Sequence, residues 1–121
     1  MADRTMNQDE LKSRTKQLAL RIIILVGALP KTIPGIIIGK QLVRAGTSVG
    51  ANYRAACRGR SCSEFTAKLG TVEEEADECG YWLEIIVESG LMPIAKVQPL
   101  LQEADELVAI MAASIKTAKR S

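Results

Sequence analysis

The stretch FTAKLGTVEEEADECGYWLEII, residues 65–86, decides the fold class of this chain. Its apolar residues recur at alternating steps of four and three, the spacing that places side chains on one face of an α-helix. A half-buried β-strand would instead need a period of two. The stripe consists of Phe65, Leu69, Val72, Ala76, Cys79, Leu83 and Ile86. We therefore predict one long amphipathic helix here.

Signals for starting and stopping a helix flank this stretch. Ser61 or Ser63 can accept a hydrogen bond from a first-turn amide, and Glu64 follows Ser61 by three residues, as in a capping box. Gly90 is a natural C-terminal stop. The helix is therefore expected to fill the space between Ser61 and Gly90.

Proline and glycine divide the rest of the chain into further helical segments. Breaks are expected at Pro30 with Pro34 and Gly35, at residues 59–63, and at residues 90–93. The first and last contain proline, which removes a helix hydrogen bond and clashes with the preceding turn. The other predicted helices run from about 9 to 29, from about 36 to 58, and onward from Pro93. Four such segments with short connections predict a single all-α domain over residues 1–121, an antiparallel up-down-up-down four-helix bundle.

Each of the other three helices has its own predicted core stripe. The first is Leu11, Thr15, Leu18, Ile22, Leu25 and Leu29. The second is Ile38, Leu42, Ala45, Val49, Asn52 and Ala56, and the last is Val97, Leu101, Ala104, Val108, Met111, Ile115 and Ala118. Further apolar residues beside the first and last stripes exceed the needs of one core, so we expect an oligomer interface there.

Three glycines lie inside the second predicted helix, namely Gly39, Gly46 and Gly50. Each costs about 1 kcal/mol of helix propensity relative to alanine. Packing must therefore hold this helix, and its small residues would allow a neighbouring helix to approach closely.

The residue types present argue against catalytic chemistry. The chain has no histidine, which excludes serine–histidine and cysteine–histidine catalysis and carboxylate–histidine metal pairs. Cys57, Cys62 and Cys79 lack metal-site spacing and are best interpreted as reduced thiols of a cytoplasmic protein. The apolar run at 22–29 is far too short to span a membrane. We expect no catalytic residues, metal, cofactor or membrane span.

Charge is unevenly distributed along the chain. The net formal charge is +2, yet residues 30–63 carry six bases without an acid, and residues 64–106 carry eleven acids against two bases. Such polarity between segments is more informative than the total.

The basic segment contains a regular row on the second predicted helix. Lys40, Arg44, Arg54 and Arg58, with Thr47 and Ala51 between them, share one face about 27 Å long at the helical rise of 1.5 Å per residue. Such a row can neutralise phosphates without reading bases. Equally, it can form ion pairs, within or between subunits, with an acidic stripe on the third helix. That stripe consists of Glu74, Asp77, Glu84 and Glu88.

A run of residues, SVGANYR at 48–54, carries a family resemblance that extends along nearly the whole chain. Matching residues also occur at 29–31, 38–42, 44–45, 64–65, 68–70, 75–78, 81–83, 101, 103–104, 106–107 and 114–116. The chain resembles the bacterial "four helix bundle protein" family, named for reading frames within intervening sequences of large-subunit ribosomal RNA genes. The accessory variability proteins of diversity-generating retroelements are similar to this family.

The resemblance implies a ring-shaped homopentamer without enzyme activity. From the retroelement proteins it also implies a basic surface that binds nucleic acid and a reverse transcriptase. The family's basic positions on the second helix correspond here to Lys40, Arg44 and Arg54. Asn52 and Tyr53 are motif residues that we assign to packing.

Two hypotheses for function follow. In the first, an oligomeric accessory protein binds RNA or DNA electrostatically, together with a reverse transcriptase. Its expected phosphate contacts are Lys40, Arg44, Arg54, Arg58 and Arg60, assisted by Lys116, Lys119 and Arg120 near the C-terminus. In the second, a structural oligomer or protein-interaction module uses its charged stripes to join subunits and binds no nucleic acid directly.

Overall fold

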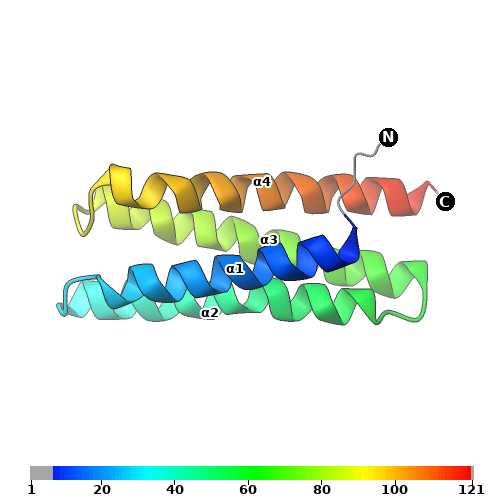
Figure 1. Cartoon of the computed structure of the whole chain (residues 1–121), viewed down its shortest axis with the longest axis horizontal. Coiled ribbons are helices and arrows are strands. Elements are labelled where there is room, and N and C mark those ends of the chain that lie inside the picture. Colours follow the sequence, from blue (N-terminus) through cyan, green and yellow to red (C-terminus); the bar gives the residue numbers. More distant parts are fainter. Residues whose placement is uncertain (1–6, 121) are drawn as a thin grey trace.

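Four helices pack as an antiparallel bundle in a computed structural model that describes residues 7–120. They are α1 (Gln8–Gly27), α2 (Ile33–Cys57), α3 (Cys62–Glu88) and α4 (Ile94–Lys119). Successive helices run in opposite directions, so α1 begins and α4 ends at the same end of the bundle (Figure 1). All four predicted helices are present, and residues 7–120 contain no strand.

Side-chain caps explain where two of the helices begin. Asn7 and Glu10 form a reciprocal capping box at α1, in which each side chain accepts from the other residue's backbone N–H, at 2.8 and 3.1 Å. At α3 the cap is Ser61, whose hydroxyl accepts from the N–H of Glu64 at 3.0 Å. The Glu64 carboxylate accepts from the N–H of Arg60 instead of Ser61, so the predicted capping box is only half formed.

The start of α2 differs from the predicted one. The helix begins at Ile33, inside the expected break, and Thr32 caps it by accepting from the N–H of Gly35 at 3.2 Å. Pro34 therefore lies in the first turn, where a missing N–H removes no intrahelical hydrogen bond. Proline marks the beginning of this helix and does not interrupt it.

The core is built from the predicted stripes with two corrections. The stripes of α1 and α3 are buried, except that Phe65 is half-buried. On α2, Tyr53 takes the core position expected for Asn52, and Ile38 is half-buried. The buried face of α4 is rotated relative to the predicted one and consists of Val97, Leu100, Ala104, Leu107 and Met111. Leucines stand at adjacent positions 100–101, so sequence spacing alone did not identify the inner one.

Glycines of α2 lie against side chains of α1 with little or no room for a side chain of their own. A Cβ added at Gly46 would lie 2.6 Å from Ile22 Cδ1, and one at Gly39 would lie 2.9 Å from Val26 Cγ1. At Gly50 it would lie 3.2 Å from the hydroxyl of Thr15. The expected close approach of a neighbouring helix is therefore observed, and the neighbour is α1.

The helices α1 and α4 make far fewer contacts than the other neighbouring pairs. Arg14 bridges them, with Nε 2.6 Å from Glu103 Oε2 and Nη2 2.6 Å from Glu106 Oε1. Hydrogen bonding to Glu103 and then to Glu106 raises the pKa of Arg14 despite the opposing effect of burial. An ion pair therefore joins the two helices whose backbones approach each other least.

Surplus apolar surface lies on α1 and α2, whereas it was expected on α1 and α4. The predicted surplus residues Leu100 and Leu107 of α4 belong to the core. The exposed large apolar side chains on α1 and α2 are Leu20, Ile23, Ile24, Ile33, Ile36 and Ile37. None of the helices in the described part of the chain is long and apolar enough to cross a membrane.

The close α1–α2 contact predicts opposite outcomes for one substitution at two glycines. Gly46→Val should lower the free energy of unfolding by about 1–3 kcal/mol, because the added side chain overpacks against buried Ile22. Gly70→Val is the matched control, since nothing lies within 4 Å of a Cβ there, and it should change stability by less than about 0.5 kcal/mol. Urea denaturation of both variants measures the difference, and equal effects would contradict the packing described.

Candidate nucleic-acid interface

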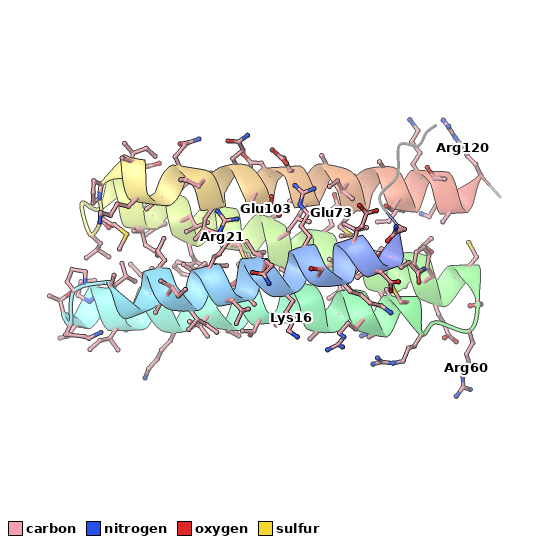
Figure 2. The ribbon with its side chains drawn as sticks, viewed as in Figure 1. Lys16, Arg21, Arg60, Glu73, Glu103 and Arg120 are labelled. Carbon is pink, nitrogen blue, oxygen red and sulfur yellow. The ribbon has the colours of Figure 1, made fainter. Side chains whose placement is uncertain are left out.

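The predicted basic row of α2 lies on the surface. Its six positions are all exposed: Lys40, Arg44, Thr47, Ala51, Arg54 and Arg58. Arg60 follows in the connection to α3, is also exposed, and points away from the bundle (Figure 2). One face of α2 and its connection therefore present the cations expected to contact phosphate.

Arg44 differs from the rest of this row because acids of α3 hold it. Its guanidinium forms an ion pair with Glu78 and lies 3.4 Å from Glu75 Oε1. The same Glu78 carboxylate accepts from the indole N–H of Trp82 at 3.0 Å. Hydrogen bonds from Arg44 and then from Trp82 lower the pKa of Glu78 below its usual range. Arg44 thus ties α2 to α3 inside one chain.

The ion-pairing interpretation is therefore correct for Arg44 within one chain, although its partners there are not the predicted acids. Glu75 and Glu78 are half-buried at the α2–α3 edge. The predicted acids Glu74, Asp77, Glu84 and Glu88 are exposed and form no ion pair within residues 7–120. Both rows follow helical spacing, so only the packing angle between α2 and α3 selects which one faces Arg44.

The remaining predicted cations form no ion pair closer than 4 Å with any residue in 7–120. On α2 and its connection these are Lys40, Arg54, Arg58 and Arg60; at the end of α4 they are Lys116, Lys119 and Arg120. Figure 2 shows Arg60 and Arg120 at the same end of the bundle but pointing away from each other. The structure therefore groups the α2 cations on one face and does not add Arg120 to it.

Two lysines of α1, which the sequence analysis did not assign to the interface, lie beside this row. Lys12 and Lys16 line a surface groove between α1 and α2 together with Arg54. Figure 2 shows Lys16 on the α2 side of α1, whereas Arg21 points toward α4. The sequence carried a signal for this pair, because their spacing of four places them on one face of α1.

Carboxylates and thiols are the other reactive groups of the described residues. No group of three Cys, Asp or Glu side chains within residues 7–120 could hold a metal ion. Burial raises the pKa of the Cys79 thiol to about 12, so it stays protonated at neutral pH. Cys57 is half-buried, and the thiol of exposed Cys62 lies 3.3 Å from the carbonyl oxygen of Ala118.

Comparisons with known proteins identify relatives of this chain. The profile of a family described as 23S rRNA-intervening sequence protein matches residues 8–113, in agreement with the resemblance found in the sequence. A crystal structure of a protein with unknown function from the S23 ribosomal protein family of Bacteroides thetaiotaomicron VPI-5482 is also similar. Its sequence is 29% identical, the match covers 92% of this chain and 99% of that one, and the TM-score is 0.84. No curated protein matches the chain.

The contacts of Glu78 predict how its titration responds to a change in Arg44. In Arg44→Gln the pKa of Glu78 should rise toward its ordinary value of 4.5, because the largest stabilising influence on the carboxylate is removed. The rise should be incomplete while Trp82 still donates, and Trp82→Phe in addition should complete it. Carboxyl titration by NMR measures this directly.

The sign of the corresponding stability change follows from linkage. Because folding lowers the pKa of Glu78, its contribution to stability is present above the unfolded value and is lost as pH falls through the folded value. Arg44→Gln should therefore weaken the acid dependence of unfolding. An unchanged Glu78 pKa in the variant would show that Arg44 is not held by α3 in solution.

Proposed function

Since the chain belongs to the family of 23S rRNA-intervening sequence proteins, we propose that it is a non-catalytic, homo-oligomeric accessory protein of the cytoplasm that binds RNA or DNA electrostatically. The observation that carries this proposal is the exposed α2 row. Lys40, Arg54, Arg58 and Arg60 have no acid within ion-pair distance among residues 7–120. A surface that keeps its cations unneutralised attracts a polyanion and releases condensed counterions on binding.

The shape of the row supports contact with the backbone of the nucleic acid. A straight face of about 27 Å is as long as roughly eight base-pair steps along a duplex axis, at 3.4 Å per step. Phosphate contacts fix register and orientation but carry no sequence information. We therefore propose binding that depends weakly on sequence and strongly on salt.

Self-association is the second part of the proposal, and the exposed apolar side chains of α1 and α2 support it. These residues flank the α1–α2 connection, and Ile24 and Ile33 are 74% and 76% exposed. Soluble monomers rarely leave such a cluster in water. We propose that it is buried between copies in a ring-shaped homopentamer, the assembly that the family resemblance implies. A ring would repeat the basic row and raise the overall avidity.

A nucleic-acid enzyme, a reverse transcriptase in particular, is the protein partner that we propose from the resemblance to retroelement accessory proteins. The alternative function is a structural oligomer or protein-interaction module without nucleic-acid binding. Two observations favour this alternative: Arg44 already pairs inside the chain, and the apolar cluster alone can drive assembly. The two functions differ in what a change to the basic row should do.

Reversing charge in the row separates these functions. Arg54→Glu combined with Arg58→Glu should abolish binding of a duplex or a structured RNA while leaving the oligomer intact. Arg44 is left unchanged because its loss would disturb the α2–α3 contact.

The control is Lys68→Glu combined with Lys96→Glu, which makes the same change in net charge on α3 and α4. This control should bind more tightly than the α2 variant. Fluorescence anisotropy over a series of salt concentrations, with light scattering for mass, gives both readouts. Affinity that is independent of salt, or equal loss in both variants, would contradict nucleic-acid binding by α2.

Polar substitutions in the apolar cluster test the assembly. Ile24→Asp combined with Ile33→Asp should convert the oligomer to folded monomers, because these side chains are 74% and 76% exposed in the single chain and a charge there mainly opposes burial between copies. Ala67→Asp with Ala112→Asp, at exposed sites on α3 and α4, is the control and should remain oligomeric. Chromatography with light scattering reports the masses. A wild-type monomer, or an oligomer that survives the isoleucine changes, would place the interface elsewhere.

A further inference from the structure

We propose that the groove between α1 and α2 at Lys12, Lys16 and Arg54 is a phosphate-binding cleft that anchors the backbone of the bound nucleic acid. This inference rests on the proposed function and adds α1 to its binding surface. The groove has a volume of about 530 Å³ and is lined by residues from both helices. It therefore differs from the α2 row, which is a convex face of one helix.

The composition of the groove is selective for anions. Lys12, Lys16 and Arg54 are its charged lining residues, and no carboxylate lines it. Ammonium and guanidinium groups only donate hydrogen bonds, so their partner must accept. Phosphate oxygens accept and carry charge, which makes these hydrogen bonds short and strong.

Neutral donors complete the lining. The exposed side chains of Ser13 and Gln17 also face the groove and form no hydrogen bond with other residues in 7–120. By contrast, the hydroxyl of Thr47 already donates to the carbonyl of Val43 at 2.8 Å. The groove thus holds free donors from α1 beside the cations, as a site for an acceptor-only ligand requires.

Small residues keep the groove open and its two walls close together. Gly50 and Ala51 of α2 lie in it, and Gly50 packs against Thr15 at the α1–α2 contact. Thr15 is fully buried, and its hydroxyl is satisfied by the carbonyl of Leu11 at 2.8 Å. Larger residues at positions 50–51 would fill the space in which a phosphate would lie.

Lys12 and Lys16 differ from Arg14 of the same helix in having no acidic partner among residues 7–120. Arg14, on the α4 side of the same helix, is neutralised by Glu103 and Glu106. Lys12 and Lys16 form no ion pair with residues 7–120, whereas Arg14, two residues from each of them, is held by the acids of α4. Arg54 belongs to both the groove and the α2 row, so the cleft and the row form one continuous surface.

The spacing of the two lysines suits successive phosphates. Four residues of helix place them about 6 Å apart along the axis, close enough for each to contact one of two neighbouring phosphates of a strand. Each lysine that contacts a phosphate should contribute about one unit to the slope of log affinity against log salt concentration.

The test compares Lys12→Gln combined with Lys16→Gln against Lys68→Gln combined with Lys96→Gln, which remove the same charge from α3 and α4. The probe is a 20-base-pair DNA duplex, with binding followed by anisotropy between about 50 and 200 mM salt. The α1 variant should bind at least about tenfold more weakly at the lowest salt. Its plot of log affinity against log salt concentration should become less steep by about two units of slope. The control pair should retain the wild-type slope.

A charge-preserving variant, Lys12→Arg with Lys16→Arg, should bind like the wild type. If the wild type binds the duplex and the glutamine variant shows the same salt slope, the cleft does not contact phosphates. The proposed binding by the α2 row would still hold. Absence of binding by the wild type would overturn both proposals. Thermal unfolding followed by circular dichroism confirms that the variants compared are folded.

Discussion

The close packing of α1 on α2 is the constraint on which the functional surface depends. Gly39, Gly46 and Gly50 remove the side chains that would separate the two helices, and α1 fills the space with Val26, Ile22 and Thr15. Each glycine weakens the helix by about 1 kcal/mol relative to alanine, so the contact must offset that loss. Its consequence at the surface is that the outer faces of α1 and α2 lie side by side, with only a shallow groove between them.

Two kinds of surface follow along this pair of helices. Toward the α1–α2 connection the exposed side chains include the isoleucines and Leu20, with Lys31 and Lys40 beside them. Toward the α2–α3 connection they include Lys12 and Lys16 of α1 and Arg54 and Arg58 of α2. Two other arginines are not available to an anion because they already form ion pairs, Arg14 with α4 and Arg44 with α3. The same amino-acid type thus holds the bundle together where an acid faces it and is available to a ligand where none does. This division supports assembly at one end and anion binding at the other.

Much of the fold could be predicted from the sequence because one face of each helix must be apolar. The stripes of α1 and α3 are correct, apart from half-buried Phe65, since an unbroken spacing of four and three runs through each. On α4, Leu100 and Leu101 are both apolar, and only packing within the bundle selects Leu100. Tyr53 is buried in place of Asn52 for a related reason, because the angle between helices fixes which neighbour points inward.

The site was predictable only within one helix. Helical spacing correctly placed Lys40, Arg54 and Arg58 on one exposed face of α2. It could not identify Glu75 and Glu78 as the partners of Arg44, or bring Lys12 and Lys16 beside Arg54, because those relations depend on how two helices pack. Contacts between helices are long-range in sequence, and charge spacing along one segment does not encode them.

If nucleic acid lies along the α1–α2 face, it should cover the lysines of that face. Lysine footprinting of the unmodified protein measures this cover. Acetylation rates measured by mass spectrometry, with and without a bound duplex, would report each lysine separately. We expect the bound duplex to slow the acetylation of Lys12, Lys16 and Lys40. Lys68 and Lys96 should be acetylated at the same rate with and without the duplex. Protection confined to Lys68 and Lys96, or equal labelling of all five lysines at saturating duplex, would contradict binding along the α1–α2 face.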